Sequence, residues 1–355
     1  MTTTWPTDRL VSLLGIEHPV VQGPFGGGAS SVALATAVSN AGGLGSFGAH
    51  ALRPDEITDL VTALRAATDR PFAVNLWVPQ PSEVTDVDLA PHVERLRPLY
   101  ERTGSAPPSG HSVQSFDDQL AAALDAAPPV LSFVMGVPPA AALDTARRKG
   151  IRTVGTASTV EEAEALAAAG LDVVVASGSD AGGHRGAFLR PVEESLVGTF
   201  SLVPQVVDAV DVPVVAAGGI ADGRGVAAAF ALGAHGVQIG TGFLNTVDSN
   251  ASKPHRRALN STDARRTVLT RVFSGRLARG IANRVTRDLA GAEREVPAYP
   301  VQNALMMPIR AAAADRGDPV DLNLWSGQAA PLTRETTAVE YLTRLVREAQ
   351  ALLRG

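Results

Sequence analysis

The segment of residues 177–186 contains the side chain best suited to proton transfer. It reads SGSDAGGHRG, so His184 stands among glycines just after the apolar run 172–176. Helix packing does not explain a histidine there, and an imidazole pKa of about 6.5 suits acid–base chemistry at neutral pH. A loop histidine is often only a solvated polar residue, but the six others lack this position: His18, His50, His92, His111, His235 and His255. We expect His184 to be the catalytic acid or base.

Two glycine-rich turns indicate a phosphate site. AGGIADG follows the apolar run 213–217, and QIGTG ends the run 236–240. Glycines let backbone N–H groups approach an anion closely. Either turn alone could equally be a tight strand-to-helix turn, but a barrel binds phosphate after neighbouring strands seven and eight, so the pair favours a phosphate. The candidate ligands are Gly218, Gly219, Gln238, Ile239, Gly240 and Thr241.

Two amide side chains also follow or lie within apolar runs. Gln22 precedes Gly23 in VVQGPFGGG, and Asn75 interrupts the apolar segment FAVNLWV. A buried amide needs hydrogen-bond partners, which a heteroaromatic ring would supply. For Asn75, a structural hydrogen bond to a neighbouring strand explains the position equally well.

Other kinds of site find little support. There is no cysteine, HxH or HExxH, so we expect no metal. The two lysines, Lys149 and Lys253, lie outside the apolar runs, which argues against a Schiff base.

Asp180 either orients His184 or is simply a polar loop residue, and we favour the second interpretation. Glycines 43, 45 and 48 spell GxGxxG, but no helix begins there as a dinucleotide site requires.

The apolar runs recur between Ala-rich helical stretches such as 160–169 and 196–210. This alternation is typical of β/α units and a parallel sheet, and eight units predict an α/β fold, a (β/α)8 TIM barrel. The predicted strands are 19–22, 43–47, 72–76, 130–134, 151–155, 172–176, 213–217 and 236–240.

Two segments interrupt the alternation. Residues 79–108 are rich in Pro, Asp and Glu and predict an insertion with one short helix. Residues 252–322 are Arg-rich and helix-like, centred on SGRLARGIANR, and predict a smaller, mainly helical lobe that covers the site with Tyr299 and its neighbours. We expect a barrel over 1–251, this lobe over 252–322 and a C-terminal segment, 323–355, that packs back on the barrel through an amphipathic helix at 335–353.

Composition narrows the partners. The 355 residues carry a net charge of −5 without a dense basic block, so neither nucleic acid nor a membrane surface is expected to bind. No leader-like or membrane-spanning apolar segment occurs, and we expect a cytoplasmic protein of undetermined oligomeric state.

Several motifs, in order along nearly the whole chain, resemble the nitronate monooxygenase family. They are VVQGPFGGG, AVSNAGGLGSFGA, NLWVP, GSDAGGHRG, PVVAAGGIADGRGVAAAFALGAHGVQIGTGF, SGRLARGIANR and LWSGQ. The resemblance implies bound FMN, with Gln22, Gly23, Asn75, Gly182 and Gly183 as flavin contacts. It further implies Gly218 and Gly219 with residues 238–241 as the phosphate cradle, and His184 as the catalytic base. Ser177 is a further candidate for a flavin contact, and it stands where the family often has Gln and the related enoyl reductases often have Glu.

The resemblance implies oxidation of alkyl nitronates or nitroalkanes with O2 to a carbonyl compound and nitrite. The required division of labour is physically consistent, because a general base moves the proton and the cofactor performs the redox step. Two alternatives remain: an NAD(P)H-dependent FMN reductase of the same fold, acting on enoyl-ACP or quinones, and a non-catalytic FMN-binding protein of a pathway.

Overall fold

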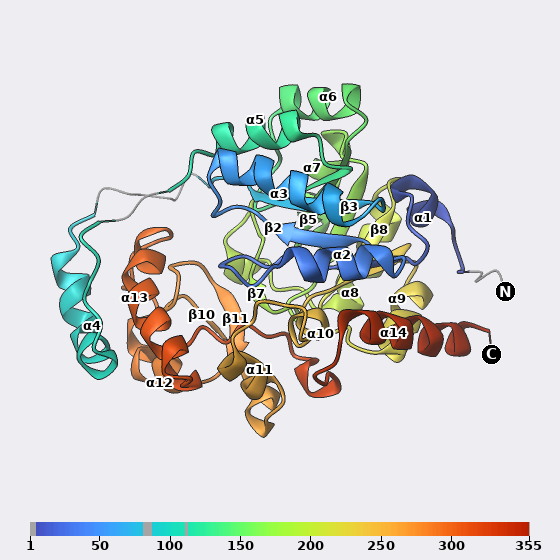
Figure 1. Cartoon of the computed structure of the whole chain (residues 1–355). Helices are drawn as coiled ribbons and strands as arrows, with labels where there is room; N and C mark the ends of the chain where they lie inside the picture. Colours follow the sequence, from blue (N-terminus) through green and yellow to red (C-terminus); the bar gives the residue numbers. More distant parts are fainter. Residues whose placement is uncertain (1–4, 81–86, 111–112, 355) are drawn as a thin grey trace.

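Eight parallel strands form a barrel in the computed structural model, which describes residues 5–80, 87–110 and 113–354. Their order is β1-β9-β8-β6-β5-β4-β3-β2, and a parallel bridge between Val21 and Leu44 brings the first and last strands of this order together (Figure 1). The strands are β1 (Val20–Gln22), β2 (Gly45–Gly48), β3 (Phe72–Trp77), β4 (Val130–Val134), β5 (Arg152–Ala157), β6 (Val173–Ser177), β8 (Val214–Ala217) and β9 (Gly236–Ile239).

One helix follows each strand and covers the outside of the barrel. These helices are α2 (Val32–Asn40), α3 (Pro54–Ala67), α5 (Phe116–Ala126), α6 (Ala140–Arg148), α7 (Val160–Ala168), α8 (Thr199–Ala209), α9 (Gly223–Ala231) and α14 (Ala338–Leu353). The last of them arrives after a long excursion of the chain, and its residues Tyr341 and Leu345 join the core between strands and helices. It lies against α9 and α2 in the same place that a directly connected helix would take.

The strands are apolar on both faces because both faces are buried. Outward-facing Val74 and Val174 pack with the helices, whereas inward-facing Val175 and Val215 belong to a separate cluster inside the barrel. Helix α1 (Arg9–Leu14) closes the lower end of that cluster with Leu14. The alternation of side chains along the strands therefore produces two apolar layers, one outside and one inside the barrel. The polar residues at the strand ends lie at the rim opposite α1.

The structure confirms the predicted barrel, with strand ends shifted by one or two residues. The GxGxxG segment lies mainly in β2, and the next helix, α3, begins only at Pro54. A side chain at Gly45 would collide with the carbonyl oxygen of Ala35, so this glycine serves close helix–strand packing rather than nucleotide binding.

A second, three-stranded antiparallel sheet lies at the rim. Its order is β10-β11-β7, formed by β10 (Thr267–Thr270), β11 (Ala278–Ile281) and β7 (Gly183–His184). The helix-like interpretation of SGRLARGIANR is therefore wrong at its centre, where residues 278–281 form the middle strand. Tertiary pairing with the loop after β6 outweighs a local preference for helix.

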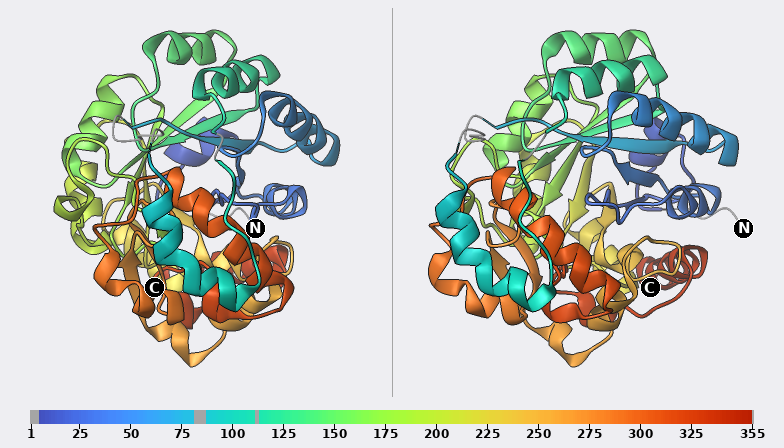
Figure 2. Two further views of the ribbon diagram at one scale, coloured as in Figure 1. Left: turned by 90° about the vertical axis from the view of Figure 1, so that its left-hand side faces the viewer. Right: turned by 60° about the vertical axis from the view of Figure 1, so that its left-hand side comes forward.

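The rest of the lobe is helical. It contains α11 (Lys253–Leu259), α12 (Arg284–Asp288) and α13 (Val301–Asp315), whereas the short helix α10 (Thr241–Leu244) directly follows β9 of the barrel. The insertion after β3 adds α4 (Ala90–Thr103), a longer helix than expected, and residues 81–86 of that insertion lie outside the described part. Both views of Figure 2 show α4 beside α13, away from the barrel helices.

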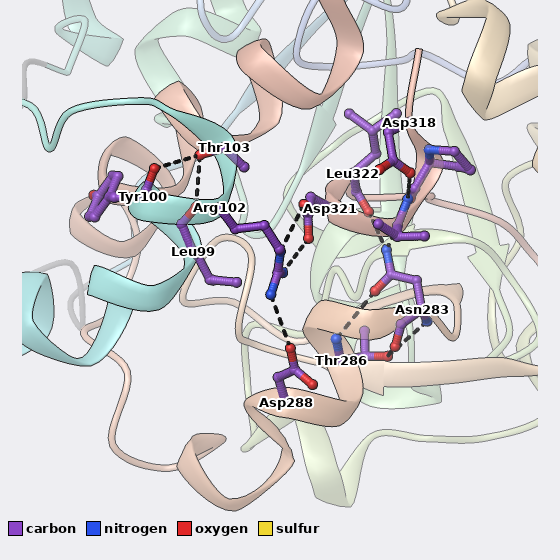
Figure 3. Close-up of polar contacts among 12 residues, drawn as sticks. Leu99, Tyr100, Arg102, Thr103, Asn283, Thr286, Asp288, Asp318, Asp321 and Leu322 are labelled. Atoms are coloured by element: carbon purple, nitrogen blue, oxygen red, sulfur yellow. Dashed lines mark hydrogen bonds and ion pairs between the residues drawn. The ribbon is translucent and has the colours of Figure 1, made fainter. Parts of the chain in front are cut away.

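Apolar and ionic contacts hold α4 to the lobe. Leu96 and Leu99 share a cluster with Phe273 and Leu305. The guanidinium of Arg102 reaches across to the buried carboxylate of Asp321 and, at 3.4 Å, to Asp288 (Figure 3). We therefore propose counting α4 with the lobe of residues 252–322. No helix in the described part of the chain is long and apolar enough to cross a membrane.

Candidate active site

His184 lies at the junction of barrel and lobe. As part of β7 it stands opposite Ala278 of β11, so a strand of the lobe holds the histidine loop in place. Its Nε2 is 2.8 Å from the hydroxyl oxygen of Ser274, which precedes β11. The imidazole is thus positioned by one backbone ladder and one side-chain contact.

Burial, with smaller contributions from the neighbouring His50 and Arg310, lowers the pKa of His184 to about 3. The same causes, burial and then the charge of Arg276, lower the pKa of His50 to about 4. Both rings are therefore neutral at pH 7, and a neutral imidazole can accept a proton.

Aromatic rings surround His184. The edges of Trp77 and Trp325 meet it at centroid distances of 5.0 and 5.3 Å. The ring of His50 stacks on Trp77 with a centroid distance of 3.7 Å, and Tyr299 lies tilted against Trp77 at a centroid distance of 5.6 Å. Such rings exclude water and hold the imidazole without donating a charge to it.

Two guanidinium groups add positive charge beside the aromatic wall. Arg276 lies over the rings of Tyr299 and Trp77, at 4.7 and 5.4 Å, and burial lowers its pKa to about 10. Arg310 of α13 bonds the side chain of Asn303 at 2.9 Å, and burial lowers its pKa to about 10 as well. Both remain protonated at neutral pH, and protonated guanidinium groups attract anions.

The loop between β6 and β7 is tied to the barrel by its own polar residues. The carboxylate of Asp180 accepts hydrogen bonds from the backbone N–H and the hydroxyl of Thr199, at the start of α8. Arg185 donates to the carbonyl and hydroxyl oxygens of Ser177. Asp180 therefore anchors a helix start rather than His184, in agreement with the favoured interpretation, and Ser177 has its hydroxyl committed to the loop.

The glycine-rich turns after β8 and β9 meet the histidine loop. Gly218 and Gly219 adopt positive φ angles of 104° and 70°, which glycine accepts without strain. A side chain at Gly182 would lie 2.4 Å from the backbone nitrogen of Gly327, and that nitrogen donates to the hydroxyl of Thr241 at 2.9 Å. Three strand-end loops and the segment around Gly327 thus converge.

This convergence leaves backbone donors available. Within the described residues, the N–H groups of Gly219, Gly240 and Thr241 have no hydrogen-bond acceptor. Gly23 lies against Gly240, where a Cβ on Gly23 would be 3.1 Å from the Gly240 Cα. Free N–H groups on adjacent glycine turns can receive the oxygens of a phosphate.

Strand alternation separates the other predicted contacts. Gln238 and Asn75 point into the barrel, and Asn75 donates to the carbonyl and hydroxyl oxygens of Ser132 at 3.2 and 3.0 Å. The structural hydrogen bond considered for Asn75 is therefore present. Gln22 and Ile239 face the helix layer, where Gln22 is fully buried and accepts from the Ser46 N–H at 2.8 Å.

Sequence reasoning missed most of the lobe side of the site. The residues it did not single out are Trp77, Ser274, Arg276, Arg310, Trp325 and Gly327. Three of them lie in the quoted motifs NLWVP and LWSGQ, and two in SGRLARGIANR, but nothing in spacing alone shows which side chains face His184. Within the described part, no three His, Asp or Glu side chains are grouped to hold a metal.

Comparison with known proteins gives a consistent result. The profile of the nitronate monooxygenase family matches residues 7–348. A probable nitronate monooxygenase of Staphylococcus aureus (strain JH9) is 39% identical over 98% of this chain and 99% of its own. Among solved structures, a nitroalkane oxidase from Streptomyces ansochromogenes superposes with a TM-score of 0.90 at 40% identity, covering 98% and 99% of the two chains.

A more distant likeness extends to a second solved structure. FabK from Thermotoga maritima has a TM-score of 0.78 at 30% identity, over 99% of this chain and 98% of the other. The family profile and the relatives matched over nearly their full length all indicate nitronate monooxygenases. This chain therefore belongs to the nitronate monooxygenase family, and it is an oxidoreductase.

Proposed function

We propose that this protein is an FMN-dependent nitronate monooxygenase, which oxidises alkyl nitronates or nitroalkanes with O2 to carbonyl compounds and nitrite. The observation that carries the proposal is His184: a neutral imidazole, walled by two tryptophans, beside two buried guanidinium groups. A neutral base next to positive charge suits a substrate that loses a proton and becomes an anion.

The glycine turns suit the phosphate of FMN. The open N–H groups of Gly219, Gly240 and Thr241 would receive its oxygens, and the close approach of Gly182 to Gly327 leaves no room for a side chain in the cradle. When bound, FMN supplies the electron transfer from substrate to oxygen that no side chain here can perform.

His184 holds the proton in this mechanism. Its neutral ring takes the α-proton of a nitroalkane, and the C–H electron pair stays on the substrate as the nitronate. A pre-formed nitronate needs no such step. The imidazolium that forms is buried, so it is a strong acid and returns its proton readily.

The arginines and the tryptophans bind and shield the anion. Positive charge from Arg276 and Arg310 lowers the free energy of a nitronate relative to the neutral nitroalkane, which favours deprotonation. Trp77, Trp325 and Tyr299 exclude water, so this attraction is screened less than it would be in solvent.

The direct test is an oxygen-electrode and nitrite assay on FMN-loaded protein. It compares a primary nitroalkane, its pre-formed nitronate and NADPH as electron donors. Nitrite formation with oxygen uptake supports the proposal, and turnover of the neutral nitroalkane implicates a base. If neither the nitroalkane nor the nitronate causes oxygen uptake, the proposal is refuted.

The likeness to FabK favours one second candidate, an NAD(P)H-dependent FMN reductase. Rapid bleaching of the flavin by NADPH without oxygen, together with no nitrite from nitronates, would establish this alternative. The anion-favouring arginines beside His184 weigh toward the monooxygenase.

A further inference from the structure

We propose that Ser274 is a positioning residue that selects the reactive tautomer of His184, holding the proton on Nε2 and leaving Nδ1 as the nitrogen that takes the substrate proton. The inference rests on the proposed function for its kinetic consequence. The tautomer itself is a property of the folded protein, whatever the substrate.

The hydroxyl of Ser274 has three contacts. Its oxygen lies 2.8 Å from Nε2 of His184, 3.2 Å from the carbonyl oxygen of Arg276 and 3.4 Å from the backbone nitrogen of Arg276. The side chain is 1% exposed, so water does not replace any of these partners.

A hydroxyl carries one proton and two acceptor lone pairs. The Arg276 carbonyl can only accept, so the Ser274 proton satisfies it, and both lone pairs then accept from Arg276 N–H and His184 Nε2–H. If the hydroxyl instead donated to Nε2, it would have no proton for the carbonyl. All three contacts form together only when Nε2 is protonated, and the closest of them is the one to His184.

The surroundings of His184 keep the ring from turning over. The backbone of His184 is paired with Ala278, and Trp77 and Trp325 meet the ring on their edges. Among the described residues, no side chain or backbone group hydrogen-bonds to Nδ1, which leaves this nitrogen for a substrate. Burial keeps the ring neutral, so one nitrogen is bare at neutral pH.

The proton step then balances simply. The substrate C–H bond breaks, its electron pair remains on the nitronate, and the proton forms a bond to Nδ1. Nε2 keeps its own proton throughout, and its hydrogen bond to Ser274 strengthens as the ring becomes charged.

The first test measures the tautomer in the native holoenzyme. The nitrogen NMR spectrum of FMN-loaded protein labelled with 15N-histidine, with His184 assigned from the spectrum of His184→Asn, should show protonated Nε2 and unprotonated Nδ1. A protonated Nδ1 would overturn the inference even if the enzyme oxidises nitroalkanes well.

The second test is kinetic. Ser274→Ala should lower kcat/KM for a neutral nitroalkane about 10- to 100-fold, because part of the contribution of a general base is lost when its tautomer is not held. Turnover of the pre-formed nitronate should stay within about twofold, since that substrate needs no base. Ser274→Thr, which keeps the hydroxyl, should recover most of the nitroalkane activity.

A matched control is Ser249→Ala. Ser249 is another buried serine, 5% exposed, whose hydroxyl oxygen lies 2.7 and 3.0 Å from the carbonyl oxygens of Leu244 and Thr246, away from His184. It should leave the ratio of the two activities unchanged. Equal losses on nitroalkane and nitronate in Ser274→Ala, with normal FMN content, would mean that Ser274 acts only in packing.

Discussion

The two halves of the active site are built in different ways. The barrel half offers backbone: glycine turns after β8 and β9, and a histidine loop tied down by Asp180 and Arg185. The lobe half offers side chains, among them Ser274, Arg310 and Trp325, which lie beside His184 and come from segments far away in the sequence. In the proposed function, backbone binds the cofactor and side chains bind the substrate.

This division teaches where each property of the enzyme can change. Main-chain donors tolerate almost any sequence that keeps the turn, so the cofactor side depends mainly on glycines. The lobe side depends on how α4, β11 and α13 pack together, since these elements carry or support its side chains (Figures 2 and 3). Changes on one side should therefore leave the other intact.

The largest effect is expected at His184, where the halves meet. His184→Asn should reduce kcat/KM for a neutral nitroalkane by about 10² to 10⁴, the usual contribution of a general base. Bound FMN, measured from its absorbance, should stay at the native level because the cradle is untouched. His92→Asn, on the distant helix α4, serves as the control. Full nitroalkane activity in His184→Asn would remove His184 from the mechanism.

On the lobe side, Asp321→Asn should reduce the free energy of unfolding by about 2 to 3 kcal/mol. The Asp321 carboxylate is 1% exposed, and breaking a buried ion pair is costly, although partial exposure of Arg102 reduces the cost. Urea unfolding measures the change. Asp288→Asn removes the outer partner of the same arginine, 47% exposed, and should cost less than about 0.5 kcal/mol. Similar losses in both variants would contradict this account of how α4 is held.

On the barrel side, Gly182→Ala should weaken FMN binding about tenfold or more, equivalent to about 1.4 kcal/mol. The added Cβ meets backbone atoms of Ser326 and Gly327, so the loops must separate. Flavin titration of apo-protein gives the dissociation constant. Gly291→Ala, where a Cβ meets nothing within 4 Å, is the matched control. If Gly182→Ala holds FMN normally, the cradle lies elsewhere.

The smallest expected change is with pH. Since burial lowers the pKa of His184 to about 3, its active neutral form persists as the pH falls from 8 to 5. Nitroalkane turnover should then fall by no more than about twofold, whereas a base with the ordinary pKa would lose about 30-fold at pH 5. A loss of that larger size, with FMN still bound, would show that His184 titrates normally in the holoenzyme.

Much of the barrel half was predictable. Alternating apolar runs and Ala-rich helices specify β/α units because strands buried on both faces must be apolar. Glycine turns at strand ends predicted the proposed phosphate cradle, and a histidine among glycines predicted the proposed base. The same periodicity could not assign Gln22 or Ile239 to a face, because one residue of register moves a side chain to the other side of a strand.

The sequence alone determined the barrel, the strand ends that carry the site and the identity of His184, because these depend on local patterns that repeat along the chain. Only the tertiary structure decided that residues 278–281 form a strand, that α4 joins α13, and that Ser274, Arg310 and Trp325 lie beside the histidine. Those features arise from contacts between segments about 90 to 200 residues apart, such as His184 with Ser274 and Tyr100 with Leu305, and no local pattern encodes them.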